Sequence, residues 1–485
     1  MKRLLFVLLA LTITILLVGC GDIIDNADSS KSGEIADSAS SVLGDKSVGG
    51  SLVDGDSADS EGGADATSGS CAASDIASPD NPDVDDEKEG YKFSLSLDEG
   101  AELGLLNGVI TLEPRDKEFQ LYFGNDDGKL KGYTKIGEGK GDFTLDKVVV
   151  PPEATRLIIS IDGEEYFEKI PEECLLFGKD AFVFGVLSDI HYNKYYSDGE
   201  NDDAIYSFDN ALDYFDEIGV QMVGVTGDLS NDGEESALVY YNEAISGRSY
   251  PVFTVVGNHD MPAYTSGLWT KHISEKIENC EFAENGTDYI YKPQGEDGDV
   301  FIFFNLTRWS YSNKRATVVA PAQLDWLEEK LELYKDRRVY LFFHLFLCGP
   351  DGEKHTGVGN IMNPGGYTYP LPYNYANYDE RTFRILMRDY KNVVYFSGHS
   401  HWMFEMEIYG DWLNYSNYDG TYCHMVHVPS VTEPRWIGEN DTDRTGKHGE
   451  SSQGIVMYDY GDISVLVPID FITGTIFTEY MEIIK

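Results

Sequence analysis

The tetrapeptide Gly257-Asn258-His259-Asp260 directly follows the apolar run Pro251-Val252-Phe253-Thr254-Val255-Val256. This run has the length and the β-branched and aromatic content of a buried strand, so the polar tetrapeptide lies where that strand ends. In open α/β sheets, ligands bind outside the carboxyl ends of the strands. A glycine, an amide, an imidazole and a carboxylate that stand together at such a position therefore indicate a reaction centre.

The same pattern, an apolar strand that ends in polar side chains, occurs four more times. These strand ends carry Asp189-Ile190-His191, Gly227-Asp228-Leu229-Ser230-Asn231, His344 and Gly398-His399-Ser400-His401. Carboxylate, amide and imidazole groups in this mixture suit borderline divalent metals. Two such ions, about 3.5 to 4 Å apart, need about seven or eight protein ligands with one shared carboxylate. The strand ends supply that number.

Strands and helices alternate from Phe182 onward, which predicts a layered α/β domain. Pro321 suits the first turn of one of the helices. The expected order is strand 182–187, helix 205–215, strand 221–225, helix 321–334, strand 338–343, helix 379–390 and strand 393–396.

Residues 91–171 have a different pattern of short alternating apolar segments, such as Phe119-Gln120-Leu121-Tyr122-Phe123. Turn sequences such as Asp162-Gly163 separate them, and no helical period is present. This spacing predicts a small all-β sandwich of fibronectin-like or immunoglobulin-like type. Nothing in it resembles a catalytic group, so we expect it to act as a spacer or to present substrate.

The chain of 485 residues is long enough for two folded domains with tails. It holds 37 Lys and Arg against 84 Asp and Glu, which gives 37 − 84 = −47. A surface this acidic repels nucleic-acid polymers and anionic membrane surfaces. A small phosphorylated substrate that is attracted to a local metal centre remains compatible with it.

The amino terminus has the features of a secretory signal, because Met1-Lys2-Arg3 precedes an apolar run from Leu4 to Val18. The run ends in Leu17-Val18-Gly19-Cys20, which resembles the bacterial lipobox. We therefore expect a signal peptide at 1–19 and a lipid on Cys20 that holds the protein to the outer side of a bacterial membrane. An ordinary signal peptide with an incidental cysteine is the alternative.

Residues 20–90 consist mainly of Ser, Gly, Ala and Asp with almost no aromatic residue. Such a segment cannot bury enough apolar surface to fold, so we expect a disordered acidic stalk. A second unusual segment, 348–377, is rich in Gly, Pro, Asn and Tyr and directly follows a strand-end histidine. It is interpreted as a loop that covers the substrate, with a disordered insertion as the alternative.

The five strand-end sequences together resemble the calcineurin-like metallophosphoesterase superfamily, and the similarity runs from about Phe182 to the carboxyl terminus. The resemblance implies a four-layer αββα fold for residues 172–485. It also implies two divalent metal ions (Mn, Zn or Fe) and a metal-bridging hydroxide as the nucleophile. Carried over to this sequence, the first metal is bound by Asp189, His191 and His401, the second by Asn258, His344 and His399, and Asp228 bridges them.

The resemblance also implies a role for the histidine that follows the second metal's amide ligand. His259 contacts the substrate phosphate and protonates the leaving group, and Asp260 orients and charges it. Purple acid phosphatases have a tyrosine after the second strand end and lack a histidine in the first. Here those positions are Asn231 and His191, so a tyrosinate bound to ferric iron is not expected.

These features predict a membrane-anchored bacterial phosphoesterase that acts outside the cytoplasm on a small phosphate ester. The Asp-x-His strand end resembles the branch that hydrolyses cyclic nucleotides and glycerophosphodiesters, which favours a phosphodiester. A phosphomonoester is the first alternative. The second is a surface binding protein in which the sandwich functions and the hydrolase domain is a scaffold. The sequence does not indicate the oligomeric state.

Overall fold

The computed structural model describes residues 90–192, 200–309, 318–346, 378–399, 401–405, 416–417, 423–437, 444–446 and 449–485. The expected signal peptide, the lipidated Cys20, the stalk up to residue 89 and the loop 348–377 lie outside the described residues. One compact unit contains all of the described residues. No helix in these described ranges is both long and apolar enough to cross a membrane.

Eight antiparallel strands between Lys92 and Lys169 form an all-β sandwich, as predicted. Its halves are β1-β2-β6 and β5-β3-β7-β8, and β5 and β6 meet through the single pair Lys140 and Asp142. A separate apolar core fills the sandwich. The strands are β1 (Lys92–Leu97), β2 (Leu105–Glu113), β3 (Glu118–Asn125), β4 (Gly128–Lys129), β5 (Gly137–Lys140), β6 (Asp142–Val149), β7 (Arg156–Ile161) and β8 (Glu164–Lys169).

The α/β domain contains two large sheets. The first has the order β11-β10-β9-β21-β22-β23, with β24 also beside β22. Its first three strands are parallel and the others are antiparallel. The strands are β9 (Phe182–Leu187), β10 (Met222–Val225), β11 (Val252–Thr254), β21 (Gln453–Asp459), β22 (Ser464–Asp470), β23 (Thr475–Ile476) and β24 (Glu482–Ile484).

The second sheet has the order β12-β13-β14-β15-β16-β18-β17, and β14, β15, β16 and β18 run parallel to one another. Its strands are β12 (Cys280–Phe282), β13 (Tyr289–Tyr291), β14 (Val300–Phe303), β15 (Val339–Phe342), β16 (Val393–Ser397), β17 (Ser416–Asn417) and β18 (His424–His427). A small hairpin of β19 (Arg435–Ile437) and β20 (Arg444–Gly446) lies apart from it.

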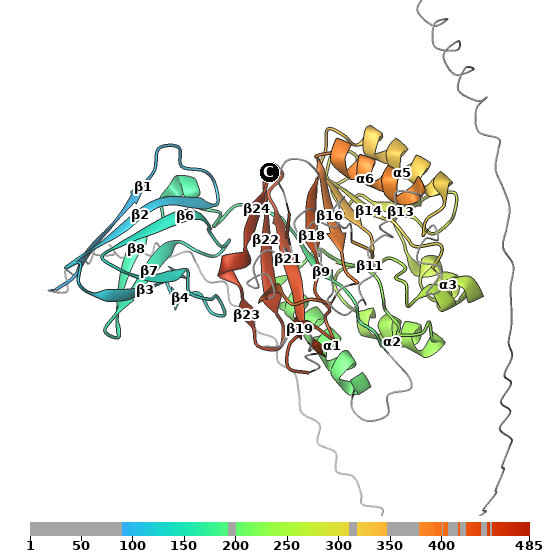
Figure 1. The fold of residues 1–485 in the computed structure, drawn as a ribbon, viewed down its shortest axis with the longest axis horizontal. Coiled ribbons are helices and arrows are strands. Elements are labelled where there is room, and N and C mark those ends of the chain that lie inside the picture. The colour runs from blue at the N-terminus through green and yellow to red at the C-terminus, as the bar shows by residue number, and fades with distance from the viewer. Residues whose placement is uncertain are drawn as a thin grey trace, which may run out of the picture. The chain divides into compact units, whose positions relative to one another are not determined.

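The two sheets pack face to face through aromatic side chains such as Phe184 from β9 and Phe301 from β14, whose ring centroids lie 5.1 Å apart. Helices cover the outer faces, and Figure 1 shows α5 and α6 together over the second sheet. The predicted four-layer αββα arrangement is therefore confirmed. The helices are α1 (Glu200–Ile218), α2 (Glu235–Ile245), α3 (Met261–Ser266), α4 (Leu268–His272), α5 (Pro321–Leu333) and α6 (Tyr378–Asp389).

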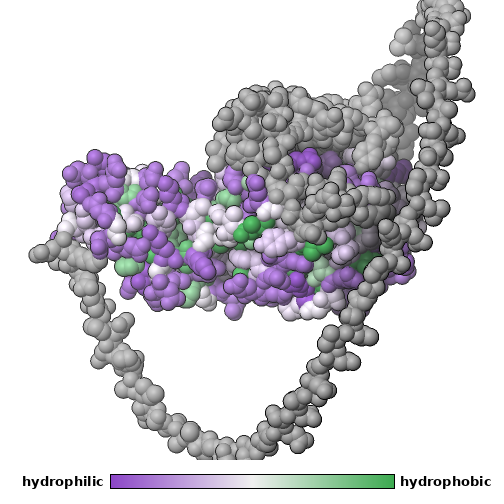
Figure 2. Space-filling model, turned by 90° about the horizontal axis from the view of Figure 1, so that it is seen from below, coloured by the Kyte–Doolittle hydropathy of each residue, from purple (hydrophilic) through white to green (hydrophobic). Residues whose placement is uncertain are grey.

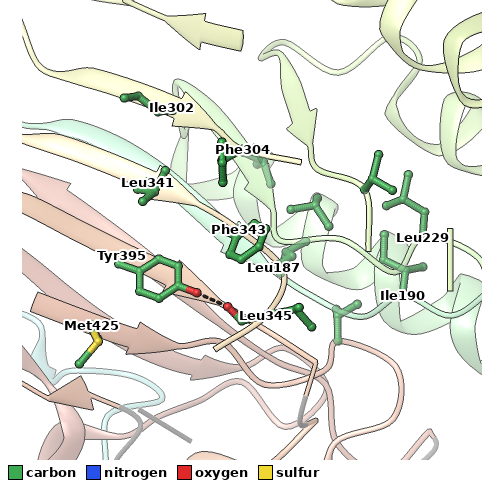
Figure 3. Close-up of a cluster of buried hydrophobic side chains, with 14 of the residues drawn as sticks. Leu187, Ile190, Leu229, Ile302, Phe304, Leu341, Phe343, Leu345, Tyr395 and Met425 are labelled. Carbon is green, nitrogen blue, oxygen red and sulfur yellow. Dashed lines mark hydrogen bonds between the residues drawn. The ribbon is translucent and has the colours of Figure 1, made fainter. Parts of the chain in front are cut away.

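Apolar residues at the strand ends fix the positions of the loops that follow. Figure 3 shows Ile190 near Leu229, and Leu187 near Phe343 and Leu345, the two residues on either side of His344. The hydroxyl group of buried Tyr395 donates a hydrogen bond to the backbone carbonyl of Leu345. The loops that carry Asp189, Asp228 and His344 are thus anchored by side chains packed in the core.

The surface agrees with the acidic composition. On the face drawn in Figure 2, hydrophilic residues predominate among the described residues and the apolar ones lie in small groups. The three cysteines in the described part of the chain, Cys174, Cys280 and Cys423, carry free thiols. No disulfide bond therefore contributes to the described fold.

Candidate metal centre

The seven predicted metal ligands follow five strands of the two sheets, and all of them lie at carboxyl ends. In the first sheet, β9, β10 and β11 end just before the segments 188–191, 226–228 and 255–260. In the second sheet, β15 ends before His344 and β16 before His399 and His401. Parallel strands end at the same edge, so the fold brings together residues that are more than 200 positions apart in the sequence.

The first group contains Asp189, His191 and His401, whose candidate ligand atoms all lie within 4.8 Å of one another. The Nε2 atoms of His191 and His401 are 3.0 Å apart. Oδ1 of Asp189 lies 3.2 Å from Nε2 of His401 and 3.6 Å from Nε2 of His191. This is the set that the resemblance assigned to the first metal.

The second group contains Asn258, His344 and His399. Nε2 of His344 lies 2.9 Å from Oδ1 of Asn258 and 3.1 Å from Nδ1 of His399. The backbone carbonyl of Thr226 lies 2.9 Å from Nδ1 of His344. Because a carbonyl can only accept, Nδ1 carries the proton and the lone pair of Nε2 faces the group, which is the usual second contact of a metal-binding histidine.

Asp228 lies between the two groups. Its Oδ2 atom is 3.1 Å from Nε2 of His344 and 3.5 Å from Nε2 of His191. Its Oδ1 atom accepts a hydrogen bond of 2.8 Å from the backbone N–H of His259. One carboxylate therefore faces both groups, as a bridging ligand must.

Several buried polar atoms in these groups have no hydrogen-bond partner within the described residues: Oδ1 of Asp189, Oδ2 of Asp228 and Nε2 of His399. Leaving a buried polar atom unsatisfied costs about 1 to 3 kcal/mol. Divalent cations would satisfy them, and the carboxylate and imidazole donors match borderline metals. The residues present therefore fit metal ions, and they form groups that could hold them.

The backbone of the site is strained. The φ angles of Asp189, His191, Asp228, His399 and His401 are 53°, 49°, 54°, 73° and 65°. Residues other than glycine rarely adopt this left-handed region, at a cost of order 1 kcal/mol or more each. Such strain concentrates at functional sites, and here it turns five ligand side chains toward one another.

Two glycines permit close contacts around the buried carboxylates. A Cβ atom on Gly257 would lie 2.1 Å from Oδ1 of Asp228, and one on Gly398 would lie 2.5 Å from Oδ2 of Asp189. Both distances are far below van der Waals contact. Any side chain at these positions would displace a candidate ligand, which explains the glycines in Gly257-Asn258 and Gly398-His399.

The buried charges shift one another's protonation. Although burial raises the pKa of a carboxyl group, the neighbouring imidazoles lower the pKa of Asp189 and Asp228. Although burial lowers the pKa of His344, the Asp228 carboxylate raises it to about 9. Burial lowers the pKa of His399.

Residues 182–403 match the model of the calcineurin-like phosphoesterase family. This stretch is a calcineurin-like phosphoesterase domain. The resemblance stated from the sequence is thereby confirmed, as is the class of enzyme, a metal-dependent phosphoesterase. No curated protein matches the chain in sequence.

Solved structures resemble the chain at low sequence identity. A dimetal phosphatase from Danio rerio has 16% identity and a TM-score of 0.41, over 63% of this chain and 99% of that one. The purple acid phosphatase PPD1 from yellow lupin (Lupinus luteus) seeds has 13% identity and a TM-score of 0.40, over 79% of this chain and 72% of that one.

The phosphoesterase domain places His259 beside the first group, with its ring centroid 4.8 Å from that of His191. The backbone carbonyl of Asn231 lies 2.5 Å from Nδ1 of His259. Because this carbonyl must accept, Nδ1 carries a proton and Nε2 is left for other contacts. The carbonyl of Asn231 therefore accepts a hydrogen bond that orients His259.

The described hydrogen bonds of Asp260, which we expect to orient His259, go to other groups. The buried Asp260 carboxylate accepts hydrogen bonds from the backbone N–H groups of Leu229 (3.2 Å), Ser230 (3.0 Å) and Gly257 (3.0 Å). The Ser230 hydroxyl also donates to it at 2.9 Å. Asp260 thus joins the loop that carries Asp228 to the loop that carries Asn258.

Sequence reasoning missed three neighbours of the phosphoesterase site. Oε2 of Glu433 lies 3.6 Å from Nδ1 of His401, as a carboxylate behind a metal-binding histidine does. The rings of Trp309 and Phe346 lie 5.9 Å and 6.1 Å from that of His399. None of the three belongs to a strand-end motif, so no spacing in the sequence marks them.

Proposed function

We propose that the protein hydrolyses phosphate esters with two divalent cations, one in each of the two ligand groups. The observation that supports this most strongly is the convergence of the seven predicted ligands around buried atoms without hydrogen-bond partners. When bound, the cations supply positive charge for the phosphate and lower the pKa of water toward about 7. The identity of the metal (Mn, Zn or Fe) is left to experiment.

The protein's own residues prepare the site for an anionic substrate. Asp228 faces both groups and keeps them at one separation. Asn258 offers a neutral carbonyl oxygen, so that it adds no negative charge opposite the phosphate. The hydrogen bonds that His344 donates to the carbonyl of Thr226 and that His259 donates to the carbonyl of Asn231 hold both rings in one orientation.

His259 is proposed as the general acid. Its Nδ1 proton is engaged by Asn231, so Nε2 is the atom that can hold a second proton and deliver it to the leaving oxygen. Imidazole suits this role because its ordinary pKa lies near neutral pH. The residue contributes most when the leaving group is a poor one.

The proposed substrate is a small phosphodiester, with a phosphomonoester as the alternative. The preference rests on the resemblance of Asp189-Ile190-His191 to the branch of the family that acts on diesters. The net charge of −47 argues against nucleic-acid polymers as substrates. A small ester approaches the site without that long-range repulsion.

We also propose that the protein acts outside the cytoplasm and is held to a bacterial membrane by a lipid on Cys20. The support is the sequence Leu17-Val18-Gly19-Cys20 after an apolar run with a basic start. Cys20→Ser should release the protein from the membrane fraction. An unlipidated wild-type protein would contradict the proposal.

Paired chromogenic substrates test the activity. Full-length protein loaded with Mn²⁺, Zn²⁺ or Fe²⁺ is compared on 4-nitrophenyl phosphate and bis(4-nitrophenyl) phosphate. We expect Asn258→Ala to abolish turnover, and Asn392→Ala to retain it. Asn392 is a suitable control because its amide binds only the carbonyls of Tyr334 and Arg337, beyond the opposite end of β15. If neither ester reacts with any metal, the binding-protein alternative gains support.

A further inference from the structure

The strand that delivers Asn258 lies at an edge of its sheet. In the described sheet order, β11 pairs with β10 alone. The N–H of Val255 donates to the carbonyl of Val225 at 3.2 Å, so the N–H groups of Thr254 and Val256 point away from β10. An edge strand without further partners would leave these groups unpaired and would be free to shift.

Two side chains pair with this edge, one from β13 of the other sheet and one from the segment that follows β14. The Tyr289 hydroxyl accepts a hydrogen bond of 3.1 Å from the N–H of Thr254 and donates one of 2.7 Å to the carbonyl of the same residue. Oδ1 of Asn305 accepts a hydrogen bond of 2.7 Å from the N–H of Val256. Side chains thus replace the missing neighbouring strand.

Both side chains are held rigidly. The Tyr289 ring is buried and stacks on Phe303 with 4.8 Å between centroids and 12° between planes. The Asn305 side chain donates to the carbonyl of Thr287 at 2.9 Å, and its backbone N–H donates to Oδ1 of Asp288 at 2.7 Å. Gln323 at the start of α5 donates to the other oxygen of Asp288 at 2.8 Å.

We infer that Tyr289 and Asn305 are positioning residues for the second cation, acting through β11 on Asn258. Asn258 lies two residues after Val256, and its carbonyl oxygen is a neutral ligand that depends on accurate placement. The inference rests on the proposed function, because it assigns these residues to one of the two cation sites. It differs from a general stabilising role, because loss of these hydrogen bonds should weaken binding of the second cation and leave binding of the first unchanged.

Two tyrosine variants form a matched pair for the test. Tyr289 and Tyr340 are both buried in the core between the sheets. Tyr289→Phe removes the bonds to Thr254, whereas Tyr340→Phe removes a 2.7 Å bond to Ser464. Cation-free full-length protein is titrated with Co²⁺, and heat and visible absorption are followed. We expect Tyr289→Phe to weaken Co²⁺ binding to the group of Asn258, His344 and His399 roughly tenfold and to leave binding to the first group unchanged. Tyr340→Phe should bind both ions as the wild type does.

Equal affinities for the second Co²⁺ in both variants would overturn the inference while leaving the proposed function intact. A wild type that binds fewer than two Co²⁺ ions would instead contradict the proposed function. Should Tyr289→Phe fail to fold, amide hydrogen exchange of the wild type decides. The N–H groups of Thr254 and Val256 should be protected as well as those of Phe253 and Val255, and exchange at the rate of an unpaired edge would overturn the inference.

Discussion

The two ends of β15 both bury charged groups, but they satisfy them in opposite ways. Before the strand begins, Arg338 donates to Oδ1 of Asp459 (3.2 Å), the Ser464 hydroxyl (2.6 Å) and the carbonyl of Asp462 (3.1 Å). Beyond its end, His344 faces the oxygen of Asp228 that has no hydrogen-bond partner in the described chain.

This difference distinguishes a structural cluster from a functional one. The amino end pairs a cation with an anion, although Oδ2 of Asp459 also lacks a hydrogen-bond partner in the described chain. The carboxyl end gathers several such oxygen and nitrogen atoms and combines them with five left-handed backbone conformations, and an additional ligand would satisfy these atoms. In the phosphoesterase domain, the buried ion pair of Arg338 and Asp459 and the candidate metal centre therefore lie at opposite ends of β15.

The largest expected effect separates the two ends by a pair of isosteric changes. Asp228→Asn should lower turnover at least about 10³-fold, because both cation sites lose a charged ligand. The cations that stabilise the negative charge of the transition state are then bound less well. Asp459→Asn should leave turnover within about twofold and lower the melting temperature instead. Steady-state rates and thermal melting of both variants measure this. Equal losses of turnover would remove the distinction.

A second change tests chemistry without removing a ligand. His259→Asn should retain both metals and lower turnover about 10²-fold on alkyl esters, because the leaving alkoxide must be protonated. Nitrophenyl esters should lose much less, because their leaving group needs no proton. Metal analysis and rates on both ester types measure the effect. The same loss on both would exclude the acid role.

Removal of metal should lower the thermal stability of the protein, because the cations bind at the carboxyl end of β15. Ligand present at about 100 times its Kd adds about 2.7 kcal/mol, so for a domain of about 300 residues a chelator should lower the melting temperature by about 4 °C. Asp228→Asn should show little of this difference. Calorimetric melting with Mn²⁺ and with chelator measures it, and an unchanged wild-type melting temperature would speak against bound cations.

The smallest expected effect concerns the amino end. Burial and the neighbouring Asp459 carboxylate raise the pKa of Asp299 to about 8. Between about pH 4 and pH 8 the folded chain therefore holds a proton that the unfolded chain releases, so stability falls as pH rises. Asp299→Asn should remove this slope, which is of order 1 kcal/mol because the side chain is partly exposed. Denaturant unfolding at several pH values checks it, and an unchanged slope would contradict it.

The strand ends could be predicted from the sequence because apolar runs and the ligands after them are local patterns. The runs 182–187, 221–225 and 393–396 correspond to β9, β10 and β16. A parallel sheet then brings their carboxyl ends together without any further information. The seven ligand residues follow from this geometry, together with the family resemblance.

What could not be predicted depends on contacts between distant segments. Asp260 accepts hydrogen bonds from the backbone N–H groups of Leu229 and Ser230 in another loop, which no side-chain motif reveals. Left-handed conformations, such as those at Asp189 and His401, are uncommon for any residue other than glycine, so no local pattern indicated them. Tyr289 in β13 and Asn305 after β14 are far in the sequence from the strand β11 that they pair with. Tertiary structure alone shows these contacts.

Anomalous diffraction from crystals of the Mn²⁺-loaded protein tests the central claim most directly. We expect two peaks about 3.5 to 4 Å apart. One peak should be bound by Asp189, His191 and His401, the other by Asn258, His344 and His399, with Asp228 reaching both. A single peak, or none within reach of Asp228, would contradict the account.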